Sequence, residues 1–303
     1  CTPTTDCSEY TLTSQSGCSY GYESCDDGCG NVKYKCSSCT PTTDCSEYTL
    51  TSQSGCAYGY ESCNDGCENV KYKCGNVCPA SISTLEELNM VLSGTCSNRD
   101  SQTVYTVANN ISGSFSSCSA NCNYSFTLNL GGNSLGGNLD FTKMTGGITL
   151  NSGIITGSIT GSDSASLTLS GITAKSNISG KHLSLTGCTV NGKVTSKSNG
   201  IITNSSISVG GCTALVVSGQ VNITNSHLTS KQSSYCGYGN GLINPHQKSV
   251  IYMTGGTLNC QKSGNHVFNT MYIGYSEGIT VNITANNLTL NKYEDDTLTV
   301  ACP

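Results

Sequence analysis

The feature that most constrains this chain is a cysteine-rich tandem repeat at its start. Residues 1–36 and 39–74 are one segment written twice with a period of 38, and the copies differ at Ser19/Ala57, Asp26/Asn64 and Gly30/Glu68. Six cysteines per copy permit three disulfides, with fifteen possible connectivities. They are Cys1, Cys7, Cys18, Cys25, Cys29, Cys36, Cys39, Cys45, Cys56, Cys63, Cys67 and Cys74. We predict two small disulfide-rich repeats, at 1–38 and 39–77.

Neither copy has enough aliphatic side chains for a hydrophobic core. Disulfides must therefore supply the stability, at about 3 kcal/mol each. The large aliphatic residues of 1–76 are Leu12, Val32, Leu50 and Val70.

Two metal-binding interpretations of the repeats are less favoured than structural ones. Cys25 and Cys29 have zinc-knuckle spacing, but a secreted context favours bridges. Asp26-Asp27-Gly28 predicts a tight turn, because the other ligands of a calcium loop are missing. We therefore predict neither a metal nor another cofactor.

Each copy has four tyrosines, for which the sequence leaves two roles open. They either cover the disulfides and fill a small core, which we favour, or form a surface for a glycan or partner. The candidate contacts in the repeats are Tyr20, Tyr22, Tyr58 and Tyr60.

Cysteine usage and charge limit the compartment and the partners. Twenty-one cysteines indicate an oxidising, extracellular environment. The first residue is Cys1, so we expect a removed signal peptide or a longer precursor. A net charge of −5 and a single arginine, Arg99, argue against nucleic acid. No apolar run reaches the ~20 residues of a membrane helix.

A short helix followed by many strands is predicted from residue 78 onward. Ser83 as N-cap, Glu86 three residues later and an apolar face through Leu92 predict a helix near 83–93. After it come aliphatic and threonine runs separated by Gly, Asn and Ser. Seven such runs start at 148, 167, 183, 201, 221, 250 and 279.

The long spacing of these runs favours a coil of parallel strands. A β-sandwich, the alternative, predicts turns every 8–12 residues or so. A helix followed by Val104–Ile111 and stacked runs resembles the pectin-lyase-like family of right-handed parallel β-helix proteins. The resemblance covers about 80–300. It implies an all-β fold for 78–303, with a capping helix and stacked inward aliphatic residues.

Seven Asn-x-Ser/Thr sequons occur in the strand-rich region and none in the repeats. In a secreted eukaryotic protein several would carry glycans, although chance matches are common in so polar a chain. They are Asn110, Asn123, Asn177, Asn204, Asn222, Asn282 and Asn287.

Nine further cysteines leave an odd total. We assign all twenty-one to disulfides, with one free thiol or an interchain bridge expected at Cys1 or Cys302. From Cys188 to Cys260, successive cysteines are 24 residues apart, which predicts bridges between neighbouring coils. Cys118 and Cys122 are predicted to form a local disulfide that closes a short loop. The nine are Cys78, Cys96, Cys118, Cys122, Cys188, Cys212, Cys236, Cys260 and Cys302.

Catalysis is not predicted. Between 101 and 276 the acidic residues are Asp140 and Asp163, on different coils, so the paired carboxylates of a glycosidase are missing. The four histidines, at 182, 227, 246 and 266, have no acid or cysteine at a nucleophile–base spacing. Loops at 231–248 and 262–276 are the best candidates for binding, through Tyr235, Tyr238, Tyr272 and Tyr275.

These observations together predict a structural glycoprotein subunit of an extracellular assembly. It would self-associate through the coil ends and the cysteine-rich arm, with no catalytic residues. The end at 297–300 would present an unpaired edge to the next subunit. A secreted adhesin that binds glycans is the alternative, and a polysaccharide lyase or hydrolase comes third.

Overall fold

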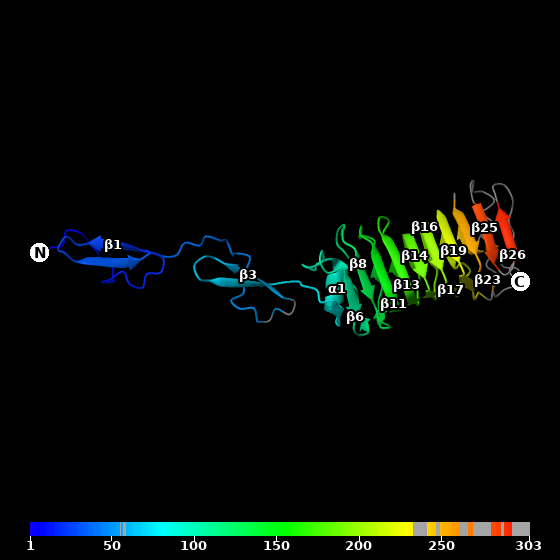
Figure 1. Ribbon diagram of the computed structural model, residues 1–303, viewed down its shortest axis with the longest axis horizontal. Helices are drawn as coiled ribbons and strands as arrows, with labels where there is room; N and C mark the ends of the chain where they lie inside the picture. The colour runs from blue at the N-terminus through cyan, green and yellow to red at the C-terminus, as the bar shows by residue number, and fades with distance from the viewer. Residues whose placement is uncertain are drawn as a thin grey trace. The chain divides into compact units, whose positions relative to one another are not determined.

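The chain divides into two compact units, Cys1–Gly75 and Asn76–Pro303, which we call the cysteine unit and the strand unit (Figure 1). The computed structural model describes residues 1–54, 56, 59–232, 241–246 and 249–259 in full. At 260, 266–268, 280–285 and 288–292 it describes the strand backbone alone. The boundary predicted from the sequence, at 77/78, falls two residues later than this division.

Each repeat of the cysteine unit is an antiparallel hairpin held by three disulfides. The hairpins are β1 (Tyr22–Asp26) with β2 (Val32–Cys36), and β3 (Tyr60–Asn64) with β4 (Val70–Cys74). Both copies join their first cysteine to the fifth, the second to the fourth and the third to the sixth. The bridges are Cys1–Cys29, Cys7–Cys25, Cys18–Cys36, Cys39–Cys67, Cys45–Cys63 and Cys56–Cys74.

The Asp-Gly sequence between β1 and β2 forms a tight turn, as predicted. The Asp27 carboxylate accepts hydrogen bonds from the backbone N–H groups of Cys29 and Asn31, at 2.8 and 3.1 Å, and from Asn31 Nδ2 at 2.8 Å. These bonds, the Asn31 side chain first, lower the pKa of Asp27. Asp27 is therefore a turn-forming residue.

The helix α1 (Leu85–Ser93) lies near the start of the strand unit, after the short strand β5 (Ser81–Ile82). Its N-cap is Thr84, one residue after the predicted Ser83, and Glu87 completes the capping box in place of Glu86. The Glu87 carboxylate accepts the backbone N–H groups of both Thr84, at 3.0 Å, and Ser83, at 2.6 Å. Leu88, Val91 and Leu92 form the buried face.

Beyond α1, the described strands pair almost entirely in parallel and form three ladders. Parallel pairing is opposite to that of the antiparallel sandwich considered above. In the first ladder, β5 (Ser81–Ile82) pairs with β6 (Val104–Val107), followed by β8 (Phe126–Asn129), β11 (Ile148–Ile155), β13 (Ser166–Ala174), β14 (Ile178–Thr186), β16 (Val194–Thr203), β19 (Gln220–Thr224), β22 (Val250–Thr254) and β25 (Thr280–Ala285).

The other two ladders consist of shorter strands and of the ends of the long ones. The second comprises β7 (Ile111–Ser112), β9 (Ser134–Gly136), the ends of β11 and β13, β15 (Thr189–Val190), β17 (Ser206–Val209), β20 (His227–Ser230) and β23 (Thr257–Cys260). The third comprises β10 (Leu139–Asp140), β12 (Ile159–Thr160), the starts of β14 and β16, β18 (Leu215–Val217), β21 (Gly241–Pro245) and β24 (His266–Phe268). One antiparallel strand, β26 (Leu288–Lys292), pairs with β25.

A column of inward aliphatic side chains along the first ladder is the centre of the core. Each member is at most 2% exposed and pairs in register with the next. No single strand could bury such a side chain alone, so each depends on the strands before and after it. The column is Leu128, Leu150, Leu169, Leu185, Ile202, Ile223 and Met253.

The chain bends at equivalent positions of successive first-ladder strands, each time at a residue whose backbone has the left-handed conformation (positive φ). Non-glycine members are Ser152, Asn204 and Asn225, with φ of 54°, 49° and 46°. Glycine fills the equivalent place at 171, 187 and 255, with φ of 61°, 61° and 71°. Asparagine and glycine are the residues that tolerate this conformation best, which explains their recurrence between the aliphatic runs.

Candidate functional site

Five of the seven predicted sequons have described side chains, and all five asparagines are exposed: Asn110, Asn123, Asn177, Asn204 and Asn222. The side chains of Asn282 and Asn287 lie outside the described residues. A glycan is attached to the Nδ2 atom of asparagine, and in the described part of the chain none of these five Nδ2 atoms donates an intramolecular hydrogen bond.

Three of these asparagines are held through the other atom of the amide. Oδ1 of Asn110 accepts the backbone N–H of Ser134, and Oδ1 of Asn177 that of Lys193, each at 2.8 Å. Oδ1 of Asn123 accepts the Thr145 hydroxyl at 3.3 Å. Each of these amides is therefore oriented by the next turn of chain while its Nδ2 stays accessible.

A buried polar column follows the bends, and the sequence reasoning missed it. The N–H of Cys188 donates to Ser205 Oγ, and the N–H of Ser205 donates to Ser226 Oγ, each at 3.1 Å. Ser205 Oγ and Ser226 Oγ in turn donate to the carbonyls of Thr203 and Thr224. Thr-Asn-Ser at 203–205 and 224–226 was the available signal.

Cys188 belongs to this column, and its prediction as a disulfide cysteine is wrong. It is a free cysteine, 2% exposed, and its Sγ lies 3.4 Å from the Leu169 carbonyl and 3.5 Å from that of Thr186. The thiol occupies the position that serine takes in the next turns, buried in the core and not bonded to another cysteine. Burial raises the pKa of this thiol.

The expectation of a free thiol at Cys1 is also wrong, because Cys1 is bonded to Cys29. Cys78 is bonded to Cys96, beside α1. Cys212 is disulfide-bonded, and its partner lies outside the described side chains. The side chains of Cys236, Cys260 and Cys302 also lie outside them, as does the end of the chain proposed as an unpaired edge.

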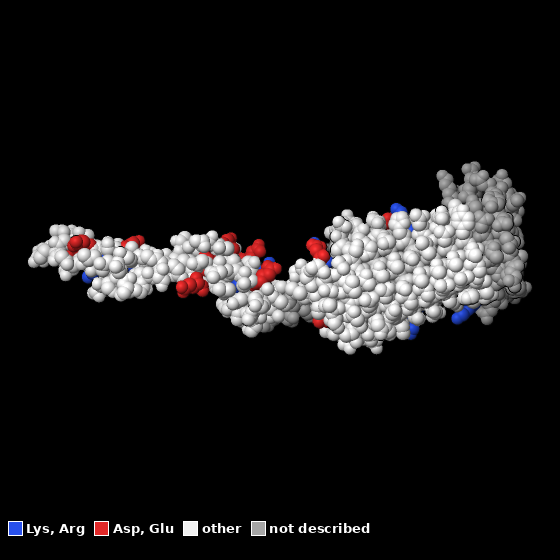
Figure 2. Space-filling model, in the orientation of Figure 1, with Lys and Arg blue, Asp and Glu red and all other residues white. Residues whose placement is uncertain are grey.

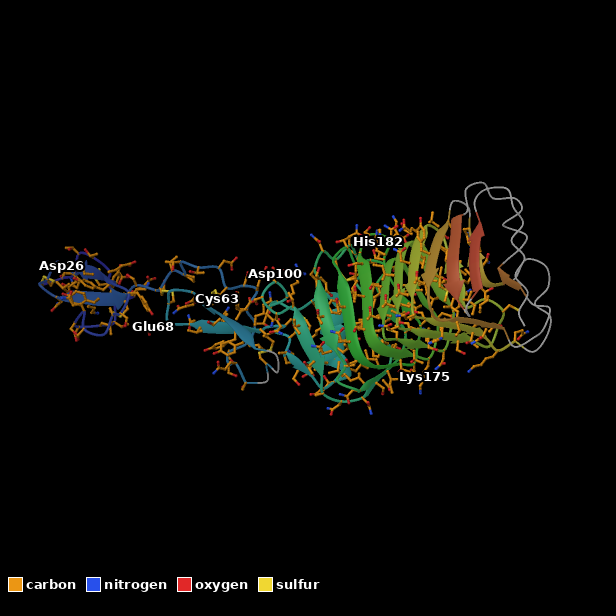
Figure 3. The ribbon with its side chains drawn as sticks, turned by 45° about the vertical axis from the view of Figure 1, so that its right-hand side comes forward. Asp26, Cys63, Glu68, Asp100, Lys175 and His182 are labelled. Atoms are coloured by element: carbon orange, nitrogen blue, oxygen red, sulfur yellow. A yellow bond between two sulfur atoms is a disulfide. The ribbon has the colours of Figure 1, made fainter. Side chains whose placement is uncertain are left out.

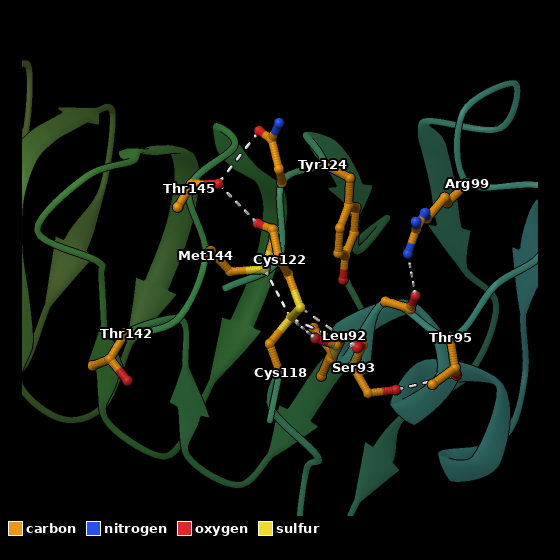
Figure 4. Close-up of a disulfide and its surroundings, with 12 residues drawn as sticks. Leu92, Ser93, Thr95, Arg99, Cys118, Cys122, Tyr124, Thr142, Met144 and Thr145 are labelled. Atoms are coloured by element: carbon orange, nitrogen blue, oxygen red, sulfur yellow. Dashed lines mark hydrogen bonds between the residues drawn. A yellow bond between two sulfur atoms is a disulfide. The ribbon is translucent and has the colours of Figure 1, made fainter. Parts of the chain in front are cut away.

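The predicted local clip is present as the disulfide Cys118–Cys122 (Figure 4). Its Cys118 Sγ packs 3.3 Å from the Met144 sulfur. Beside it, the buried Tyr124 hydroxyl donates to the Val91 carbonyl at the end of α1. The clip and the tyrosine thus attach the helix to the strands that follow it.

Two of the tyrosine candidates in the repeats, Tyr22 and Tyr60, lie in the hairpin strands β1 and β3. In the first repeat Tyr22 is 47% exposed and meets Tyr34 edge to face, with ring centroids 5.5 Å apart. Tyr60 and Tyr72 repeat this arrangement at 5.6 Å, and Tyr20 is also exposed. Tyr58, Tyr235, Tyr238, Tyr272 and Tyr275 lie outside the described residues.

The acids and histidines of the strand unit are dispersed. Asp140 Oδ1 accepts the N–H of Thr142 at 2.9 Å, and Asp163 forms an ion pair of 3.2 Å with Lys197. His227 Nδ1 lies 2.8 Å from the Thr257 hydroxyl, and His182 lies at the edge of the unit (Figure 3). Among the described residues no group of three or more His, Cys, Asp or Glu could hold a metal ion.

Charge is distributed unevenly between the units. Residues 1–76 have ten acidic and four basic side chains, a net charge of −6. The remaining residues, 77–303, have ten basic and nine acidic side chains, a net charge of +1, and within them residues 101–246 have six lysines and two aspartates, a net charge of +4. The face of the strand unit shown in Figure 2 is almost free of charge, and its lysines lie along the edges.

No family model, curated protein or solved structure matches this chain. Of the helices in the described part, none is long and apolar enough to cross a membrane.

Proposed function

We propose that the chain is a structural glycoprotein subunit of an extracellular assembly, built around a right-handed parallel β-helix and without catalytic activity. One observation carries the proposal: three parallel ladders run together through the described strand unit, each strand buried by its neighbours. Such a stack is rigid and can be extended by another subunit.

Two further features support the assignment to the cell exterior. The described disulfides, eight of them with both partners defined, belong to an oxidising compartment. The exposed sequon asparagines fit the attachment of glycans, which would cover much of the coil flank. Glycopeptide mass spectrometry of the native protein tests the second feature site by site.

Electron microscopy of native material, with non-reducing and reducing gels, tests the assembly. We expect filaments or ordered layers, and a band ladder without reductant if disulfides join the subunits. A monomer in every condition would refute the proposal.

A secreted adhesin is the second candidate, favoured by the exposed Tyr22 and Tyr60 at equivalent positions of the two repeats. Two identical sites joined in one chain would bind a repetitive glycan with avidity. Glycan-array binding that falls modestly with Tyr22→Ala or Tyr60→Ala, and collapses with both, would support it. Equal binding by the double variant would eliminate it.

A further inference from the structure

The third ladder presents a narrow polar face whose two edges bear lysines. Its outward side chains pair in register and are half-buried, and inward aliphatic residues alternate with them. These outward residues, from β12 to β21, are Thr160, Ser179, Thr195, Val216 and Asn244.

Lys175, Lys193 and Lys231 form one edge of this face, where the chain passes from the second ladder to the third. All three are exposed. Their backbone N–H groups bond to Ile155 O, Asn177 Oδ1 and Val209 O, which places the three lysines along one corner of the stack.

Lys181 and Lys197 form the other edge, inside β14 and β16, where these strands pass from the third ladder to the first. Figure 3 shows Lys175 and His182, the neighbour of Lys181 in sequence, at opposite edges of the unit. Within the described residues, Lys197 is the one lysine of this face with an acidic partner, Asp163. The lysine-edged face therefore has unpaired positive charge.

The cysteine unit has the complementary properties. Eight of its ten acidic residues are exposed. In each hairpin, cross-strand partners and alternate residues share a sheet face, and one of the two faces is mainly apolar. In the first repeat this apolar hairpin face contains Leu12, Tyr22 and Val32, at 37, 47 and 41% exposed, together with Ser24 and the acidic Asp26.

The dimensions of the two surfaces agree. Five strands of the third ladder, from β12 to β21, span about 19 Å at the usual strand spacing, and a five-residue hairpin strand is about 17 Å long. One repeat therefore covers the lysine-edged face.

We propose that the acidic cysteine unit of one copy docks on the lysine-edged face of a second copy. This inference rests on the proposed self-assembly and names the surfaces involved. The contact joins two different surfaces, so it is heterologous and leaves a free docking face on one copy and a free cysteine unit on the other. Repetition of the contact produces an open chain of subunits. The charges steer the approach, and Val216, the threonine methyls and the apolar hairpin face make the contact.

Sedimentation velocity of the full chain at 50 and 500 mM NaCl tests the proposal. The measurement is made before and after enzymatic removal of N-glycans, because a glycan on Asn177 would lie beside Lys193 and could cover the docking face. We expect association that rises with concentration and weakens at the higher salt, where screening is shorter-ranged. The variant Lys175→Glu/Lys193→Glu/Lys231→Glu should weaken it by about tenfold or more. Ile201→Glu, at an exposed position of the first ladder, is the control and should have little effect.

A mixing experiment separates docking between copies from docking within one chain. The variant Ser24→Lys/Ser62→Lys adds a lysine at equivalent exposed positions of the hairpin face that bears Tyr22 and Tyr60, and it should also associate poorly by itself. Mixed with the triple lysine variant it should recover association as pairs, because the unchanged cysteine unit of the lysine variant then meets the unchanged lysine edges of the other variant.

The outcomes distinguish the two proposals. Undiminished association of the triple variant would overturn the docking face and leave self-assembly standing. A wild-type chain that stays monomeric at every concentration and salt would overturn both.

Discussion

Replacing Ser226 by alanine tests whether the buried column behind the bends stabilises the stack. Ser226 is fully buried, and its Oγ is the hydrogen-bond acceptor for the N–H of Ser205. The alanine variant leaves that N–H buried without a partner. The Thr224 carbonyl loses the Ser226 hydroxyl as a donor but still accepts the N–H of Asn204. One orphaned buried donor lowers the free energy of unfolding by about 1–3 kcal/mol.

Ser196 provides the matched control. It is equally buried, in the same sheet, but its Oγ has no hydrogen-bond partner. Ser196→Ala removes an unsatisfied hydroxyl of the same size, so stability should stay unchanged or rise by about 1–3 kcal/mol.

Urea unfolding followed by far-ultraviolet circular dichroism, with disulfides intact, measures both variants. At an unchanged slope, the midpoint of Ser226→Ala should fall and that of Ser196→Ala should not. Equal midpoint shifts would refute the reasoning, because the two variants differ in hydrogen bonding and not in burial.

Three further predictions concern other parts of the chain. The Cys188 thiol should react with a thiol reagent only after denaturation, and the variant Cys188→Ser should fold. Burial raises the pKa of this thiol in the folded chain. The contribution of the protonated thiol to stability is therefore complete below the ordinary thiol pKa of 9.0 and is lost as the pH rises above it. Gly153→Ala would place a methyl group 2.3 Å from Leu130 Cβ and should cost about 1–3 kcal/mol in thermal or urea unfolding, whereas Gly211→Ala, with open space around it, should cost less than about 0.5. The Cys29 amide resonance should titrate below pH 3.8, the ordinary value of Asp27, and Asp27→Asn should abolish that titration.

The strand-rich region could be predicted well because its signal is periodic. Leu150, Leu169 and Leu185, read as equivalent positions of successive runs, are register partners in the structure. The helix was also found, displaced by one residue at its N-cap because Ser83 and Thr84 are both good capping residues. Both predictions rest on local patterns of the kind that sequence displays directly.

Features that depend on contacts between distant turns could not be predicted in the same way. The 24-residue spacing of Cys188 from Cys212 suggested a bridge. The turns of the chain differ in length, however, so cysteines at equal spacing need not have side chains that point in the same direction. Cys188 instead points inward beside Ser205. Disulfide connectivity in the repeats was undetermined for a related reason, since six cysteines on a chain with little core have many possible partners.

The recurring left-handed bend has an evolutionary consequence. Thr203-Asn204-Ser205 and Thr224-Asn225-Ser226 are 21 residues apart and occupy equivalent positions. Excising 204–224 would join Thr203 directly to Asn225-Ser226 and leave the same kinds of residue facing one another across the cut. Homologues of this chain should therefore differ in length by whole circuits, gained or lost by unequal recombination, and rarely by fractions of one.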